Sequence, residues 1–218
     1  MIDLGNEEIQ KERARGPVPS GSKVLVRLVL DKPKFPAPED EWVAQAKSGL
    51  RQLQCKIEVV AGTYEGVWWY ENITLPASEQ RIRLQEKQQT ACRIGGSTLR
   101  AIVESARGIE PNATDQRAAR ARHVSGWTDF DGMEFPARLG IDNRPYESRD
   151  GNLYWNNRLG SVIPATAKDY ATIRQGGEVI TDGPVTGDNG SQRNAPSGGQ
   201  DIPWSDAPHP AETDDVPF

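Results

Sequence analysis

The residues with the clearest chemical potential are Lys, Arg, Trp and Tyr side chains that alternate with apolar residues along short segments. Alternation of this kind predicts β-strands with one buried face, so these side chains should share the solvent face of a sheet. Single-stranded nucleic acid needs cations that follow phosphates and flat rings that stack on bases, each stack contributing about 1–3 kcal/mol. Because strands also favour Trp and Tyr for packing, the set rather than any single member indicates a function. The predicted nucleic-acid-binding residues are Arg27, Lys56, Trp68, Tyr70, Arg138, Tyr154 and Arg158.

A second basic cluster lies between residues 107 and 130, in the sequence RAARARH and the residues that follow it. Asp115, Asp129 and Asp131 flank the cluster and weaken its field, so a solvated helix face explains the pattern at least as well as phosphate binding does. We keep it as a secondary candidate for nucleic-acid binding, as a flap over the bound strand. Its members are Arg117, Arg120, Arg122 and Trp127.

Catalysis has little support in this sequence. Acid, base and nucleophilic catalysis generally uses His, Cys or paired carboxylates, and the only histidines are His123 and His209. Cys55 and Cys92 lie in apolar-patterned segments, where each behaves as a small hydrophobe. The carboxylate cluster Glu39-Asp40-Glu41 is expected to lie in a solvated loop or at the start of a helix. We therefore predict no catalytic residues, no metal and no cofactor, and a metal-dependent nuclease remains an unsupported alternative.

The alternating segments predict five strands. A helical segment is expected between the third and the fourth strand. A helix is expected to start at Ser78 and to break at Gly95-Gly96, and Ser97 is expected to cap a second helix that ends at Gly108. This order predicts an OB-fold, a five-stranded Greek-key barrel that binds oligonucleotides on one face, here elaborated by helices. A split α+β sheet is the alternative. The predicted strands cover residues 22–30, 53–60, 67–75, 135–141 and 152–163.

Charge divides the 218 residues into a body and a tail. Residues 1–175 carry 25 Lys and Arg against 23 Asp and Glu, a net charge of +2, whereas residues 176–218 carry one against eight, a net charge of −7. We predict a flexible arm (1–20), a binding domain (21–175) with a helical insertion at about 78–130, a disordered linker (176–213) and a terminal peptide (214–218). No apolar run approaches the roughly 18 residues of a membrane span, which predicts a soluble, cytoplasmic protein.

The terminal peptide combines acidic, aliphatic, proline and aromatic residues with the free carboxylate of the chain. It resembles the C-terminal peptide of bacterial single-stranded-DNA-binding proteins (SSB), in which Asp-rich residues precede a terminal Ile-Pro-Phe. Here Val216 stands in place of the Ile. The similar segment Asp201-Ile202-Pro203-Trp204 lacks a free carboxylate and is either an auxiliary docking segment or chance. The peptide comprises Asp214, Asp215, Val216, Pro217 and Phe218.

The body is similar to the larger SSB-type proteins of tailed bacteriophages, through GTYEGVWWYENITL, LRAIVESARGI and GNLYWNNRLGSVI. The resemblance implies sequence-nonspecific binding and protection of single-stranded DNA during phage replication or recombination. It also implies that the tail recruits partner proteins, and it leaves room for a homo-oligomer or a cooperative filament on DNA. A protein-interaction adaptor or decoy that uses the tail without coating DNA is the alternative.

Overall fold

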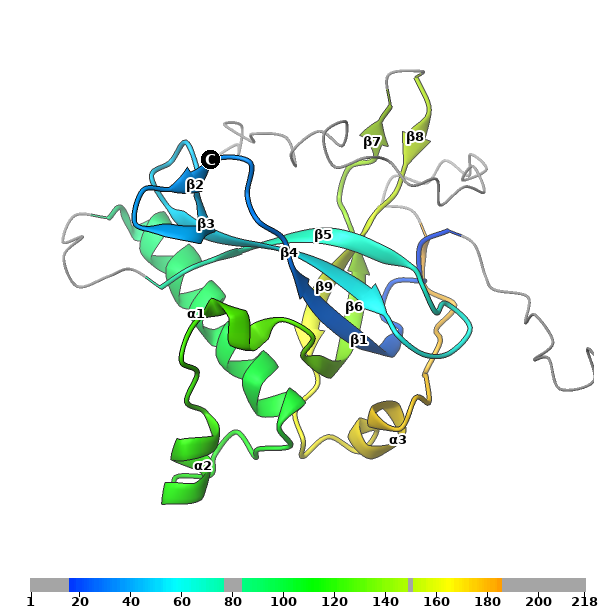
Figure 1. Cartoon of the computed structure of the whole chain (residues 1–218). Helices are drawn as coiled ribbons and strands as arrows, with labels where there is room; N and C mark the ends of the chain where they lie inside the picture. The colour runs from blue at the N-terminus through cyan, green and yellow to red at the C-terminus, as the bar shows by residue number, and fades with distance from the viewer. Residues whose placement is uncertain (1–15, 77–83, 149–150, 186–218) are drawn as a thin grey trace, which may run out of the picture.

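A computed structural model describes residues 16–76, 84–148 and 151–185 (Figure 1). This part of the chain is mainly β-structure with a few helices, as expected of an α+β protein. Its main element is a seven-stranded antiparallel sheet, in which β4 also pairs with β5 (Trp68–Thr74). The order of the other strands is β2 (Pro36–Ala37), β3 (Asp40–Gln45), β4 (Arg51–Val59), β1 (Lys23–Leu30), β6 (Glu134–Ile141) and β9 (Asn157–Val162).

The buried face of the sheet follows the predicted alternation in β1, β4 and β5. The strand register places Leu28 opposite Ile57, and Ile57 opposite Trp69. All three side chains are buried in one hydrophobic core. The neighbouring residues in each strand point to the opposite face because successive side chains in a strand alternate. The predicted strands in these three segments are confirmed.

Helix α1 (Glu86–Ala106) packs against β5, β6 and β9 and runs through Gly95 and Gly96 without interruption. The predicted break at this glycine pair is therefore wrong, and the predicted start at Ser78 lies outside the described residues. A Cβ atom on Gly95 would lie 1.6 Å from the carbonyl oxygen of Thr74. The missing side chain at Gly95 lets α1 approach the backbone of β5 closely, and it does not end the helix.

The chain between β6 and β9 forms a hairpin of β7 (Tyr146–Glu147) and β8 (Leu153–Tyr154), so the predicted single strand over 152–163 is wrong. Alternation with Tyr154 and Arg158 on the solvent face predicts that Leu153 points inward, but Leu153 is 42% exposed. Asn157 is buried instead, and its side chain exchanges two hydrogen bonds of 2.8 Å with the backbone of Val18. A polar side chain that satisfies a distant backbone segment is not visible in an apolar pattern.

The connection from β1 to β4 folds into an arm (residues 31–50) that contains β2 (Pro36–Ala37) and β3 (Asp40–Gln45), as Figure 1 shows. Of the carboxylates at 39–41, expected in a loop or a helix start, Glu39 lies in the turn between β2 and β3, and Asp40 and Glu41 are the first residues of β3. Trp127 Nε1 donates a hydrogen bond of 2.8 Å to Asp40 Oδ2, and Arg51 Nε lies 3.6 Å from Glu39 Oε1. These contacts attach the arm to the body.

The folded body extends beyond the predicted limits of 21 and 175. Val18 is fully buried. Residues 176–185 return along the start of β1, where Lys23 and Val179 form an antiparallel bridge. Glu178 accepts a hydrogen bond of 3.0 Å from the backbone N–H of Thr63 in the β4–β5 loop. The sequence missed this return because residues 177–185 have no strand period.

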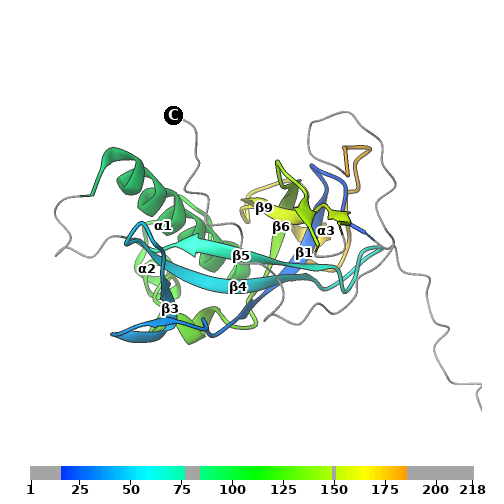
Figure 2. The same cartoon turned by 90° about the horizontal axis from the view of Figure 1, so that it is seen from above.

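Three short helices complete the described part of the chain (Figure 2). They are α2 (Gln116–Ala121), the 3₁₀ helix η1 (Trp127–Phe130) and α3 (Tyr170–Arg174). Ile173 of α3 packs with Leu25 and Ile163 in a second, smaller cluster. Helix α3 therefore covers the outer face of β1 near its start. The outer face of β4 and β5 carries several of the predicted nucleic-acid-binding residues.

Candidate nucleic-acid interface

Lys56, Trp68 and Tyr70 form a cluster on the outer face of β4 and β5. Register places Lys56 opposite Tyr70, and Trp68 lies one pair further along the same face. Lys56 Nζ lies 4.6 Å from the centroid of the Trp68 ring. The Trp68 and Tyr70 rings meet edge to face, with centroids 5.1 Å apart and an interplanar angle of 77°. All three side chains are partly exposed, so they present one cation and two rings to solvent.

The hydroxyl of Tyr70 is held in its protonated form. Burial raises the pKa of Tyr70, and the nearby carboxylate of Asp31 raises it further. A protonated phenol donates a hydrogen bond, and its ring stays neutral. At neutral pH the cluster therefore combines a stacking surface, an ammonium group and a hydroxyl donor.

Arg27 and Arg138 share this outer face but differ in their surroundings. Arg27 lies opposite Glu58 of β4 and Glu134 of β6. Its guanidinium group donates to Glu134 Oε1 from Nη2 at 2.7 Å, so Arg27 is engaged in an ion pair. Arg138 is exposed and lies beside Lys23 at the far end of the sheet from the arm. The structure thus separates Arg138 from the Lys56 cluster.

Tyr154 and Arg158, predicted on one strand face, belong to different elements. Tyr154 lies on β8 and stacks on Tyr146 of β7, with centroids 6.4 Å apart. Arg158 is exposed on β9, where its charge acts on the carboxyls of Glu71 and Asp142. The β7–β8 hairpin therefore carries a pair of stacked tyrosines. The prediction of a single strand over residues 152–163 missed this pair.

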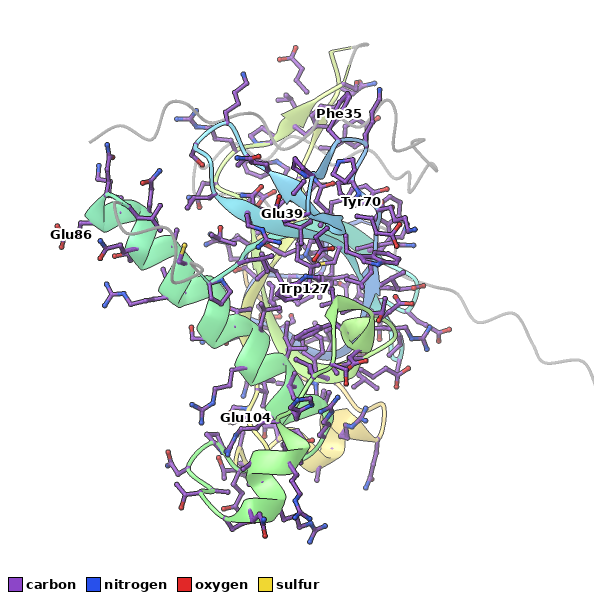
Figure 3. All side chains as sticks on the ribbon, turned by 60° about the vertical axis from the view of Figure 1, so that its left-hand side comes forward. Phe35, Glu39, Tyr70, Glu86, Glu104 and Trp127 are labelled. Carbon is purple, nitrogen blue, oxygen red and sulfur yellow. The ribbon has the colours of Figure 1, made fainter. Side chains whose placement is uncertain are left out.

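The arm carries two further rings that the sequence analysis missed. Phe35 is 73% exposed, and Lys34 Nζ lies 5.7 Å from its ring centroid. Trp42 has Lys32 Nζ 4.7 Å from its ring. Figure 3 shows Phe35 at the same end of the molecule as Tyr70. The available signal was the presence of two lysines and two aromatic residues between 32 and 42.

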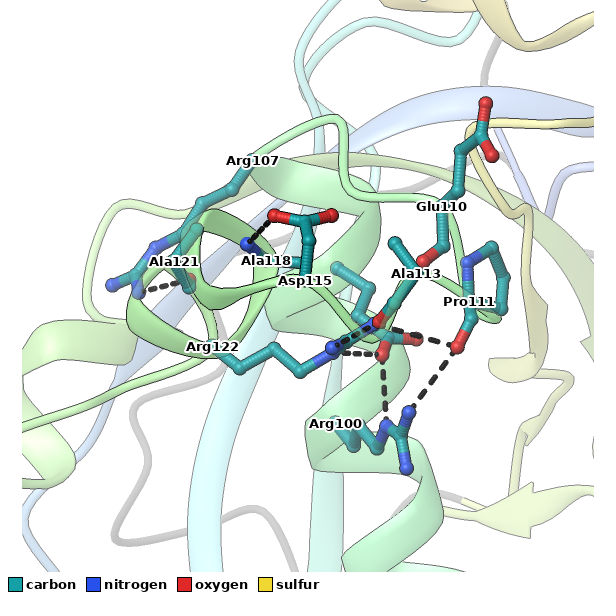
Figure 4. A network of polar contacts seen from close by, with 10 residues as sticks. Arg100, Arg107, Glu110, Pro111, Ala113, Asp115, Ala118, Ala121 and Arg122 are labelled. Carbon is teal, nitrogen blue, oxygen red and sulfur yellow. Dashed lines mark hydrogen bonds and ion pairs between the residues drawn. The ribbon is translucent and has the colours of Figure 1, made fainter.

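The secondary candidates divide into two structural residues and two exposed ones. Arg122 Nε donates to the buried Glu104 carboxylate at 2.6 Å, and its Nη1 donates to the Ala113 carbonyl at 2.7 Å (Figure 4). Trp127 stacks on Phe130 and is bonded to Asp40. Both side chains hold loops to the body, whereas Arg117 and Arg120 are exposed on α2.

Glu71 bridges the gap between β5 and β9. Its Oε2 accepts a hydrogen bond of 2.9 Å from the Leu159 backbone N–H and one of 3.3 Å from Trp69 Nε1. Burial raises the pKa of Glu71, and Asp142 raises it further, while the two hydrogen bonds and Arg158 act in the opposite direction. The carboxyl group is thus easier to protonate in the folded chain than in the unfolded one.

This raised pKa makes stability depend on pH. Protonation of Glu71 contributes to the free energy of unfolding. This contribution is fully present below the pKa of Glu71 in the unfolded chain and is lost as pH rises through its pKa in the folded chain. Glu71→Gln keeps an acceptor for Leu159 and removes the titration. We expect the variant to gain free energy of unfolding relative to wild type between pH 4 and pH 7, measured by urea denaturation at both values. Glu110→Gln, on an exposed loop, is the control, and an equal change in both variants would contradict the prediction.

Within the described residues, no helix is long and apolar enough to cross a membrane. The predicted tail residues 214–218 lie outside the described part of the chain. Comparisons with protein-family models, with curated proteins and with solved structures found no match for this chain.

Proposed function

We propose that this chain is a non-catalytic, sequence-nonspecific single-stranded-DNA-binding protein. The observation that carries the proposal is the Lys56–Trp68–Tyr70 cluster on the outer face of β4 and β5. Rings that stack on bases need no particular sequence, and the adjacent ammonium group can follow the phosphates. The hairpin tyrosines and the Phe35 and Trp42 rings of the arm would extend the path of the strand on either side.

An OB-fold is the architecture we propose for this site. Hydrogen-bonded pairing in the order β5-β4-β1-β6-β9, with α1 between β5 and β6 in the chain, is the connectivity expected of such a barrel. The Glu71–Leu159 hydrogen bond joins β5 to β9, where a barrel would close. In this fold, the outer face of the second and third strands and the adjoining loops bind oligonucleotides, which matches the position of the cluster.

The acidic tail is the proposed partner-binding element. Residues 214–218 place two carboxylates before the apolar residues Val216, Pro217 and Phe218, a combination that fits a basic rim around an apolar pocket. Recruitment of replication or recombination proteins through this peptide would bring them to the coated strand. Binding of DNA and binding of partners would then use separate parts of the chain.

Intrinsic tryptophan fluorescence during titration with oligo-dT tests the proposed function. We expect saturable quenching by the single strand and much weaker quenching by duplex DNA of the same length. Affinity should fall as salt rises, with a log–log slope of about −0.7 for each phosphate neutralised. Absence of binding at low salt, repeated in a mobility-shift assay, would contradict the proposal and favour an adaptor that uses only the tail.

A further inference from the structure

A polar side chain on the outer face of β4 is buried without a hydrogen bond. Gln54 lies two residues before Lys56 in β4, on the same face, and is only 7% exposed. Among the described residues, its Oε1 atom has no hydrogen-bond partner. A buried acceptor without a partner lowers stability, because it has given up its hydrogen bonds to water. Native proteins retain few such atoms, and a ligand that supplies the donor is one reason to retain one.

Gln54 belongs to the same surface as the candidate DNA-binding cluster. Asn72 lies directly opposite Gln54 on β5, next to the Lys56–Tyr70 pair. Cross-strand partners share one face of a sheet, so two amide side chains continue the face that carries the cation and the rings. On the other side of β4, the Asp31 N–H donates a hydrogen bond of 3.2 Å to the Gln54 carbonyl. Successive side chains on one face are about 7 Å apart, so a base stacked at Tyr70 can reach Gln54.

Charge on this part of the face favours a base edge over a phosphate. The Asp31 carboxylate lies near enough to Tyr70 to raise the pKa of its hydroxyl. A carboxylate repels phosphates, whereas the ammonium group of Lys56 attracts them. The amides of Gln54 and Asn72 are neutral and carry both donors and acceptors. The arrangement therefore favours phosphates at Lys56 and base edges at Gln54.

A glutamine amide suits a strand of any sequence. It carries an acceptor, Oε1, and a donor, Nε2, side by side. The Watson–Crick edge of every base likewise has an N–H donor beside an acceptor, and this edge is available only when the base is unpaired. Because the Gln54 Oε1 atom has no hydrogen bond to break among the described residues, the amide can turn toward a base at small cost, as interface side chains commonly do on binding.

We infer that Gln54 binds the Watson–Crick edge of one base of the bound strand. The base donates its N–H to Oε1 and accepts from Nε2, while Lys56 holds phosphate and the rings of Trp68 and Tyr70 stack. In duplex DNA the opposite base occupies this edge, so Gln54 selects unpaired bases without selecting a sequence. This inference rests on the proposed function and adds the chemical feature by which the site distinguishes a single strand from a duplex.

Oligonucleotides of N3-methylthymidine test this inference. The methyl group replaces the N–H of the Watson–Crick edge and keeps the flat ring and the phosphates. Fluorescence anisotropy at fixed salt compares the methylated strand with labelled oligo-dT of the same length. We expect the wild-type protein to bind the methylated strand about 2- to 10-fold more weakly, the range for one hydrogen bond. Equal affinities would overturn the inference alone, whereas binding of neither strand would overturn the proposed function with it.

Gln54→Met separates loss of the hydrogen bond from the bulk of the methyl group. The variant should bind oligo-dT about 2- to 10-fold more weakly than wild type and should bind both strands equally. Without DNA it should be at least as stable in urea denaturation, because a buried unpaired acceptor is removed. Gln52→Met, at the next position on the same face of β4, is the matched control and should keep the wild-type preference for oligo-dT. A preference retained in Gln54→Met would overturn the inference and assign the base N–H to another acceptor, such as Asp31.

Discussion

Replacing Trp68 by Ala is expected to weaken binding of oligo-dT by about 5- to 150-fold, because a single base–ring stack contributes about 1–3 kcal/mol. The substitution also removes the ring beneath Lys56 Nζ and leaves Tyr70 without its edge-to-face neighbour. Since Trp68 is only partly buried and lies on the outer face, the fold should be retained. Fluorescence anisotropy of labelled oligo-dT at fixed salt measures the change without relying on the removed tryptophan.

Two control variants separate stacking from a general surface effect. Trp68→Phe keeps a flat ring and should recover most of the affinity. Val185→Ala removes an exposed apolar side chain outside the proposed path of the strand and should change affinity little. The prediction fails if Trp68→Ala binds oligo-dT as tightly as wild type, and a stacking role fails if Phe and Ala at this position bind equally weakly.

Gly95→Ala is expected to destabilise the protein by about 3 kcal/mol, at the upper end of the usual cost of overpacking. The added Cβ would lie 1.6 Å from the Thr74 carbonyl oxygen, a backbone atom of β5. Either α1 or β5 must then move, and the contacts of Leu99 and Ile102 in the core move with the helix. Urea denaturation gives the change in free energy of unfolding.

The adjacent glycine provides a matched control. A Cβ on Gly96 would lie 3.1 Å from the Pro76 ring, an exposed side chain that can yield by a few tenths of an ångström. Gly96→Ala also gains helix propensity, about 1 kcal/mol at most, so its net effect should be small or stabilising. Similar losses in the two variants would show that the glycines serve flexibility of α1 and not its approach to β5.

The strand faces of the candidate site were predictable from local alternation. Lys56, Trp68 and Tyr70 were assigned to one face because Ile57 and Trp69 beside them follow the buried period, and the structure brings these three together. Tyr154 and Arg158 were predicted to share one strand, and the structure separates them. Two-residue strands such as β8 are too short for a period to appear, and residues 155 and 156 separate β8 from β9.

The glycine pair in α1 shows a second limit of prediction from local sequence. In sequence, Gly95-Gly96 is a helix breaker, because glycine lowers helix propensity. The structure retains a helix through both residues, since a helix packed along a strand gains more from close contact than it loses in propensity. Packing of α1 on β5, β6 and β9 depends on residues far apart in the chain. A short segment of sequence around Gly95 therefore does not predict it.

By itself, the sequence determined which segments form amphipathic strands, where cations and rings lie on them, and how unevenly charge divides body from tail. Only the tertiary structure decided that Arg122 and Trp127 hold loops in place, that Phe35 and Trp42 stand on an arm, and that Gln54 is buried on the outer face. The reason is physical: side-chain alternation arises from the geometry of one strand. Which charges are neutralised and which rings stay exposed depends on neighbours that only the folded chain brings together.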